Sequence, residues 1–445
     1  MVLLPSAFSL HLFFVKYMDN LNSDRGGRHL LPPALYYPVY RNFWLGMFGA
    51  VCGFQVLMFG QFWLMHELTR SPLYLGYVGM ANAIPAIILN LIGGVVADRA
   101  DKKRLIVITQ ILSTSLVVLL GLLTVLDIVR VWHVMTIAAV AGAINAFNQP
   151  ARQALYPYLI DRHALPSAVA LNSAVWSSNR ILAPAIAGLL IASFGTASAF
   201  FFAGVGMISF ALVVQRLTVP EITDQKTGNP AQDMLDGLKF ILQNSVFLFL
   251  IGMAFFNSFF GLAYVSLMPV FTREILQIGA DGQGVLLSIN GTGALIMTLV
   301  IGLRANLSHK GSVLIGGAAI FGFSIVAFAL GAEYIGSFLL AGICMFAMGV
   351  FSSTYMISVL SSLQMMVPDY MRGRLMGIYG ITWNIMPLGG LYAGVLAGII
   401  GTPFAVASGG ILVMAFAFGT AVFSKQVRNL GQSLRIEHPP SLARR

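Results

Sequence analysis

Long apolar runs alternate with short polar breaks along most of this chain. The runs are roughly 20 residues long, the length that an α-helix needs to cross the hydrocarbon core of a membrane. They lack the polar stripe at helical spacing that a surface helix of a soluble protein carries. The pattern therefore predicts twelve membrane-spanning helices, near residues 43–65, 74–97, 105–126, 132–150, 167–193, 197–215, 246–270, 283–303, 312–331, 336–361, 375–400 and 403–424.

A longer polar stretch, Arg216–Ser245, divides these spans into two sets of six. Within it, five apolar residues fall on one helical face and predict an amphipathic helix at the membrane surface: Met234, Leu235, Leu238, Ile241 and Leu242. The alternative is that this segment is only the start of the seventh span. We expect a cytoplasmic arm, a six-helix bundle, a cytoplasmic linker, a second six-helix bundle and a cytoplasmic tail, over residues 1–42, 43–216, 217–245, 246–424 and 425–445.

Composition and charge agree with a membrane protein. Hydrophobic residues make up 58% of the chain and charged residues 9%, whereas a soluble domain carries about 25% charged residues. The net charge is +10, but no basic stripe is interleaved with aromatics, so nucleic acid is not an expected partner. The two ends and the even-numbered loops hold 22 of the 26 Lys and Arg residues. Basic loops stay inside, so both termini are predicted to be cytoplasmic in a bacterial plasma or inner membrane.

Several classes of function lack their motifs in this sequence. The apolar run Leu3–Val15 has no basic start, so a cleavable signal peptide is not expected, and whether residues 1–40 belong to the true start stays open. Cys52 and Cys344 both lie in apolar spans, which argues against a disulfide framework and a metal site. The sequence contains no phosphate-binding loop, zinc-protease motif or nucleophile elbow. We therefore expect no enzyme activity, no catalytic residues, no cofactor and an external energy source.

The loop between the second and third spans carries the sharpest motif. It reads Gly94-Val-Val-Ala-Asp98-Arg99-Ala-Asp-Lys102-Lys103-Arg104. A glycine lets helices approach closely, and a basic cluster anchors the loop at an anionic inner leaflet. The loop resembles the signature of the major facilitator superfamily, although Asp101 stands where many members have glycine. The resemblance implies the major facilitator fold, in which this loop is a conformational latch, with Asp98 against the start of the eleventh helix.

Two further resemblances concern the direction of transport and the branch of the superfamily. Arg180-Ile-Leu-Ala183-Pro184-Ala-Ile-Ala-Gly188 is similar to the Gly-Pro-x-x-Gly signature of facilitator exporters, with Ala183 in place of the first glycine. Pro184 removes a backbone hydrogen bond, so the motif also has a purely structural reading as a packing kink. Other stretches resemble the bacterial effector-export branch that includes the enterobactin exporter and macrolide efflux proteins: Glu67–Pro72, Asn148–Leu155, Ala168–Ser173 and Val367–Arg374.

Charged and polar side chains within the spans are candidates for binding and coupling. Arg180 lies about 13 residues into its span, near mid-bilayer at ~1.5 Å per residue. Such a charge usually faces a cavity, so we expect it to contact a polar or anionic substrate or a coupling carboxylate. The alternative is that it caps carbonyls freed by Pro184. The spans contain no deep Asp or Glu, which makes Glu67 the first candidate for proton coupling, with helix-end solvation as the alternative.

Other polar residues are candidates for lining a central pathway, as helices 1, 4, 7 and 10 do in the facilitator fold. They are Gln55, Gln61, Asn145, Asn148, Gln149, Asn257, Tyr264 and Tyr355. Helix packing or lipid contact is the alternative for each of them. Phe255, Phe256, Phe259 and Phe260 are expected to supply an apolar wall, whereas His66 and His133 fit an interfacial place at outer helix ends.

Together these features predict a proton-coupled or otherwise gradient-driven exporter of a small amphipathic molecule such as a drug, siderophore or metabolite. A monomer is compatible with this reading, but the sequence leaves the oligomeric state open. We expect alternating access, in which the halves rock around a mid-membrane site. An importer or lysolipid flippase of the same superfamily is one alternative. A non-transporting receptor or scaffold is another. The substrate and the coupling ion do not follow from the sequence.

Overall fold

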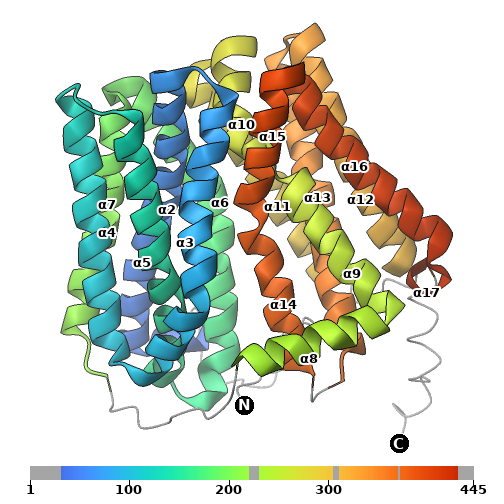
Figure 1. Ribbon diagram of the computed structural model, residues 1–445. Coiled ribbons are helices and arrows are strands. Elements are labelled where there is room, and N and C mark those ends of the chain that lie inside the picture. The colour runs from blue at the N-terminus through green and yellow to red at the C-terminus, as the bar shows by residue number, and fades with distance from the viewer. Residues whose placement is uncertain (1–31, 220–229, 304–309, 369–370, 429–445) are drawn as a thin grey trace, which may run out of the picture.

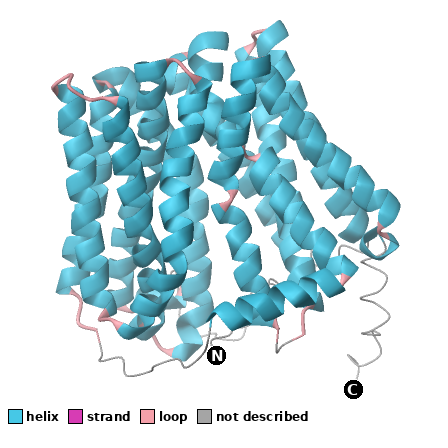
Figure 2. Ribbon diagram, viewed as in Figure 1, coloured by secondary structure: helices cyan, strands magenta, loops and turns pink. Residues whose placement is uncertain are grey.

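Every regular element in the described part of the chain is a helix (Figure 2). The computed structural model describes residues 32–219, 230–303, 310–368 and 371–428. Twelve stretches within these residues are long and apolar enough to cross a membrane, which confirms the predicted number. Such sequences form helices in lipid because a helix satisfies its own backbone hydrogen bonds where no water is available.

The first six spans form one bundle and the last six form the other (Figure 1). The first bundle contains α2 (Pro38–Thr69), α3 (Pro72–Arg99), α4 (Lys102–Val125), α5 (Val131–Leu155), α6 (Leu165–Phe194) and α7 (Thr196–Arg216). Short 3₁₀ turns precede α2 and join α5 to α6, at Pro33–Tyr36, Tyr156–Leu159 and Arg162–Ala164. We call the two bundles the N-half and the C-half.

The C-half has two broken spans. Its seventh span consists of α9 (Ser245–Phe256), a π-helix η4 (Asn257–Gly261), α10 (Tyr264–Val270) and a second π-helix η5 (Phe271–Ile275). The remaining helices are α11 (Gly279–Leu303), α12 (Lys310–Tyr334), α13 (Phe338–Met366), α14 (Arg372–Asn384), α15 (Met386–Ile400), α16 (Thr402–Phe423) and α17 (Lys425–Arg428), with α14 and α15 forming the eleventh span. π-Helices inside long helices occur often at functional sites.

The helix α8 (Pro230–Gln243) lies across the lower end of the molecule and packs on α14 of the C-half (Figure 1). Gly237 faces Ile378 and Arg374, and the Arg374 Nη1 lies 3.2 Å from the Asp236 Oδ2. On the other side of α8, Leu235, Leu238 and Leu242 are exposed. The helix thus presents an apolar face away from the protein, as a membrane-surface helix does. Ile241, also predicted for this face, is instead buried in the apolar core of the C-half, and the side chain of Met234 lies outside the described residues. We call this end the linker face and the other end the far face.

The far face consists of tight turns. Each of its six helix connections contains a residue with positive φ, a conformation that ends helices sharply. These residues are Arg70, Asp127, Gly195, Gln277, Gly336 and Gly401. The hairpins are therefore short on this side, and the helix ends of the two halves approach one another closely there.

The two halves share a core near the far face and have separate cores near the linker face. One continuous apolar cluster contains Leu64 and Leu75 of the N-half together with Leu267 and Phe271 of the C-half. Nearer the linker face, one cluster draws only on residues 34–217 and another only on residues 241–427. The halves are thus joined at the far face and part toward the linker face.

Glycines bring the helix backbones of the two halves into contact along two seams. At the α6–α11 seam, a Cβ atom on Gly188 would lie 2.4 Å from the Ala280 carbonyl oxygen, and one on Gly284 would lie 2.5 Å from the Pro184 carbonyl oxygen. At the α3–α15 seam, a Cβ atom on Gly76 would lie 2.7 Å from the Leu391 Cα. Only glycine permits such close approach.

Candidate functional site

The middle of α6 places Arg180 at the boundary between the halves. Pro184 has no N–H group, so the carbonyl of Arg180 loses its usual helical donor. This carbonyl packs against Gly291 of α11, and the Ser288 hydroxyl donates to the next carbonyl, that of Ile181, at 2.7 Å. The break in the α6 hydrogen bonds is therefore matched by a close contact with the C-half.

The Arg180 guanidinium is half-buried and extends to the C-half. Its Nη2 donates to the Asn290 Oδ1 at 3.1 Å, and the Asn290 Nδ2 donates to the Met345 carbonyl of α13 at 3.0 Å. Among the described residues, no carboxylate lies within 4.0 Å of Arg180. Within the same described residues, the Arg180 side chain also forms no hydrogen bond with the carbonyls near Pro184. Because the Arg180 guanidinium donates only to the Asn290 amide oxygen, most of its five N–H donors are left for a ligand.

Glu67, at the far end of α2, is exposed and also forms a small hydrogen-bond network. Its Oε1 accepts from the Trp63 Nε1 at 2.9 Å, and its Oε2 accepts from the Thr196 hydroxyl at 2.8 Å. Arg273 of η5 reaches it from the C-half, with its Nη1 3.7 Å from the Glu67 Oε1, and also lies over the Trp63 ring at 5.7 Å. Glu67 thus connects the two halves at the far face.

His66 lies beside this network, in the last turn of α2, and is buried against protein, with 1% of its surface exposed. Its Nε2 is 3.2 Å from the Glu274 Oε1, across the boundary between the halves. Neither ring nitrogen has a hydrogen bond of good geometry in the described structure. The Glu67–Arg273 ion pair and the His66–Glu274 contact therefore both cross the boundary between the halves at the far face.

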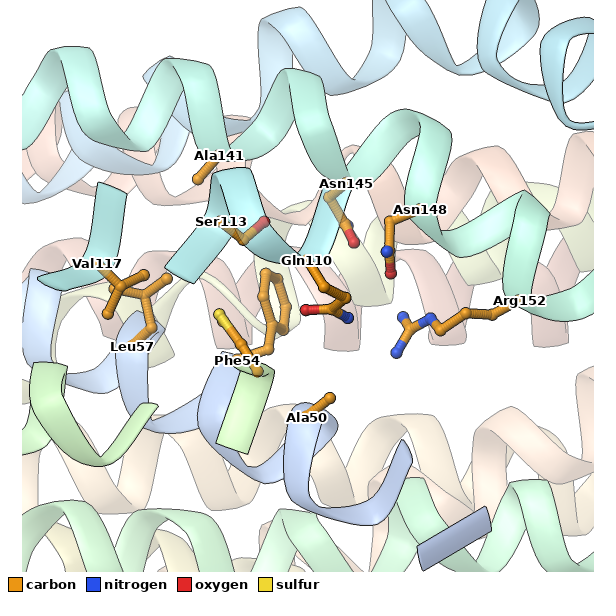
Figure 3. A pocket seen from close by; sticks show the side chains of 11 residues that line it. Ala50, Phe54, Leu57, Gln110, Ser113, Val117, Ala141, Asn145, Asn148 and Arg152 are labelled. Atoms are coloured by element: carbon orange, nitrogen blue, oxygen red, sulfur yellow. The ribbon is translucent and has the colours of Figure 1, made fainter. Parts of the chain in front are cut away.

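Four of the predicted polar residues lie on α2 and α5 of the N-half. Asn145 and Asn148 of α5 line a cavity inside the N-half, where Asn148 donates to the Thr109 hydroxyl at 2.7 Å (Figure 3). Gln55 of α2 has a buried Nε2 without a hydrogen-bond partner in the described structure. The fully buried Gln61 lacks partners for both polar atoms there.

In the C-half, the predicted polar residues are packed among helices. Tyr355 is 1% exposed and donates to the Met253 carbonyl of α9, so in this conformation it joins α13 to α9. Asn257, the first residue of η4, is fully buried, and its Nδ2 lies 3.1 Å from the Met356 Sδ. Neither side chain is available to a ligand in this conformation.

The four phenylalanines predicted to supply an apolar wall cluster around η4. Phe255 stacks on Phe259 at 5.6 Å between ring centroids, and Phe256 stacks on Phe416 of α16 at 4.1 Å. Phe260 meets Tyr392 of α15 edge to face. The four phenylalanines are half-buried.

The predicted latch loop lies at the linker face, where α3 and α14 contact one another. Asp101 caps α4 by accepting from the Arg104 backbone N–H, and its carboxylate pairs with the exposed Arg104 side chain at 3.3 Å. Arg99 is exposed and Lys102 is buried. The side chain of Asp98 lies outside the described residues.

Two glycines in these motifs differ in their surroundings. A Cβ atom on Gly94 would meet nothing within 4 Å, whereas one on the preceding Gly93 would lie 2.1 Å from the Ala146 carbonyl oxygen. The close approach expected at Gly94 therefore occurs at Gly93. In the other motif, Gly188 lies in the α6–α11 seam, and Ala183 and Pro184 lie one turn earlier on α6, with Ala183 fully buried.

Comparisons with known proteins agree with this architecture. Residues 32–440 match the family described as transmembrane secretion effector. The chain is 26% identical over 346 residues to the staphyloferrin A transporter of Staphylococcus aureus, covering 76% of this chain and 84% of the relative. It is 22% identical over 388 residues to macrolide efflux protein A of Streptococcus pyogenes, covering 85% and 94%. A solved bacterial homologue of the human lysosomal transporter Spinster, inward-facing and unoccupied, shares the fold with a TM-score of 0.66 and 14% identity, over 93% of this chain and 99% of that one.

Proposed function

The chain belongs to the transmembrane secretion effector family of the major facilitator superfamily, and we propose that it is a proton-driven exporter of a small amphipathic molecule. The linker face is cytoplasmic in this proposal, because the ends and loops on that side hold 22 of the 26 basic residues. The strongest support is the shared core at the far face beside separate cores at the linker face. That asymmetry corresponds to a transporter closed to the outside and open to the cytoplasm.

The substrate would bind between the halves, near Arg180. A carboxylate or polar group of the substrate would compete with Asn290 for the guanidinium, and a charge-assisted hydrogen bond of this kind contributes about 1.5–3 kcal/mol. When the substrate displaces Asn290 from Arg180, a movement of Asn290 would be passed to α13, because the Asn290 amide also donates to the Met345 carbonyl. The phenylalanines beside η4 supply an apolar surface for the rest of an amphipathic molecule.

Glu67 is the proposed site at which the outside proton acts. When ionised, it attracts Arg273 and favours closure of the far face. When protonated from the outside, it loses that attraction, and the outward-open state that releases substrate is favoured. The pair is about one-third exposed on each side, so its own contribution is about 1 kcal/mol or less. The ion pair therefore adjusts an equilibrium that the glycine seams dominate. Coupling further requires loss of the proton to the cytoplasm.

Transport into inside-out membrane vesicles tests this function. With an imposed proton gradient, vesicles that contain the protein should accumulate a macrolide or a carboxylate siderophore, and a protonophore should abolish the accumulation. Glu67→Gln should lose uphill accumulation while retaining downhill exchange. Accumulation only in right-side-out vesicles would establish an importer instead. Full gradient-dependent export by Glu67→Gln would show that Glu67 is not the coupling site.

A further inference from the structure

A second polar site lies inside the N-half, apart from the boundary between the halves (Figure 3). It is a cavity of about 30 Å³ between α2, α4, α5 and α7. One end is apolar and includes Leu57 and Val117, and the other is polar. The polar side chains that line it are Gln110, Ser113, Asn145, Asn148 and Arg152.

Arg152, in the last turn of α5, points along the cavity toward Gln110 and Asn148 (Figure 3). No carboxylate lies within 4.0 Å of Arg152 in the described part of the chain. Its side chain is also without a hydrogen-bond partner there. Arg152 is half-buried, and a cation partly withdrawn from water is costly unless a counter-charge is present. The proposed transport mechanism gives Arg152 no part, so its charge needs another explanation.

The surrounding amides complete a set of donors. Gln110 and Asn148 are each 5% exposed, so their amide groups are within the protein rather than in bulk solvent. Asn148 is oriented by its bond to the Thr109 hydroxyl. The Gln110 carbonyl accepts from the Thr114 hydroxyl, but the Gln110 side-chain amide has no hydrogen-bond partner in the described structure. The Gln110 amide borders the cavity, where a ligand can accept hydrogen bonds from its N–H groups.

We propose that this cavity binds a small inorganic anion such as chloride, held by the Arg152 guanidinium and the Gln110 amide. Asn145 and Ser113 offer further donors from α5 and α4. The volume selects the ligand: a site needs about 10–15 Å³ for each water-sized particle, and drug-sized ligands need roughly 300 Å³ or more. The positive charge excludes a metal cation. The bound anion joins α4 to α5 and stabilises the N-half whichever face of the transporter is open.

Thermal unfolding of the purified full-length protein in detergent tests the site without any transport assay. The unfolding midpoint is followed by tryptophan fluorescence while chloride replaces gluconate at constant ionic strength. We expect a saturable rise on the order of 2–4 °C when chloride is tenfold above its Kd. Arg152→Met should remove the rise, and Arg152→Lys should retain it at higher chloride. Arg162→Gln, which changes an exposed arginine outside the cavity, should respond like the wild type.

Gln110→Leu is the second variant, and it keeps the test usable if Arg152→Met fails to fold. Gln110→Leu should need several-fold more chloride than the wild type to reach the same rise in unfolding midpoint. Nanodiscs with and without anionic lipid separate a free anion from a lipid phosphate. A rise with chloride in neutral lipid supports the proposal. A rise that appears only with anionic lipid would overturn it. So would a wild-type protein that is insensitive to chloride, or an unchanged chloride response in both Arg152→Met and Gln110→Leu.

Discussion

Replacing Gly188 by alanine should shift the transporter away from the far-face-closed conformation. The added Cβ atom would lie 2.4 Å from the Ala280 carbonyl oxygen, about 1 Å short of ordinary van der Waals contact, which begins near 3.4 Å. The neighbouring atom is backbone, so no side-chain rotation relieves the clash. The seam must widen, and widening weakens the 2.7 Å bond from Ser288 to the Ile181 carbonyl.

Overpacking of this kind costs about 1–3 kcal/mol. The cost falls only on the conformation in which α6 and α11 touch, because the helices separate when the far face opens. A cost of about 2 kcal/mol changes the ratio of closed to open molecules by about 30-fold. Glycine-to-alanine substitution also favours helix formation by about 1 kcal/mol, but it does so equally in both conformations.

The distance between spin labels at the far ends of the two halves measures this ratio. Ile128 and Tyr334 are 53% and 72% exposed, which makes both accessible to label, and the two native cysteines are buried. In lipid, Gly188→Ala should populate longer distances at the expense of shorter ones. Gly398→Ala is the matched control, because a Cβ atom there meets nothing within 4 Å. Identical distance distributions for wild type, Gly188→Ala and Gly398→Ala would refute the role assigned to the seam.

Three further predictions concern single side chains. Arg180→Ala should reduce transport by about 10–100-fold, the value of a charge-assisted hydrogen bond, while the protein still reaches the membrane; normal vesicle transport would remove Arg180 from the substrate site. Gly142→Val should prevent folding rather than shift the conformation, because its Cβ atom would lie 2.0 Å from the Asn82 carbonyl oxygen within the N-half; the yield of monodisperse protein checks this, and wild-type yield contradicts it. Tyr355→Phe should lower the unfolding free energy by about 1 kcal/mol through loss of its bond to the Met253 carbonyl and leave transport unchanged; a large loss of transport with normal stability would instead indicate contact with substrate.

The apolar runs predicted the helices well because lipid imposes a length and composition that a single sequence displays. The pairing of His66 with Glu274 was not predictable in this way, since it joins residues far apart in sequence and depends on which face is closed. Which of Gly93 and Gly94 lies at the close helix contact could not be predicted from the sequence either. Both residues are glycine, and neighbouring positions on a helix differ by about 100° in direction. The two π-helices of the seventh span left no mark in its hydrophobic pattern, because an extra residue in a turn does not change composition.

Contact between bare backbones along the seams also bears on how fast the halves can move. Interlocked large side chains must leave their rotamer wells before two helices separate, and each such step raises an activation barrier. At Gly188 and Gly284 there is no side chain to withdraw on either helix, and Gly76 likewise presents a smooth surface to α15. The helix surfaces that hold the far face closed can therefore separate and pack again over a low activation barrier. One interface thus permits both firm closure and rapid change between conformations.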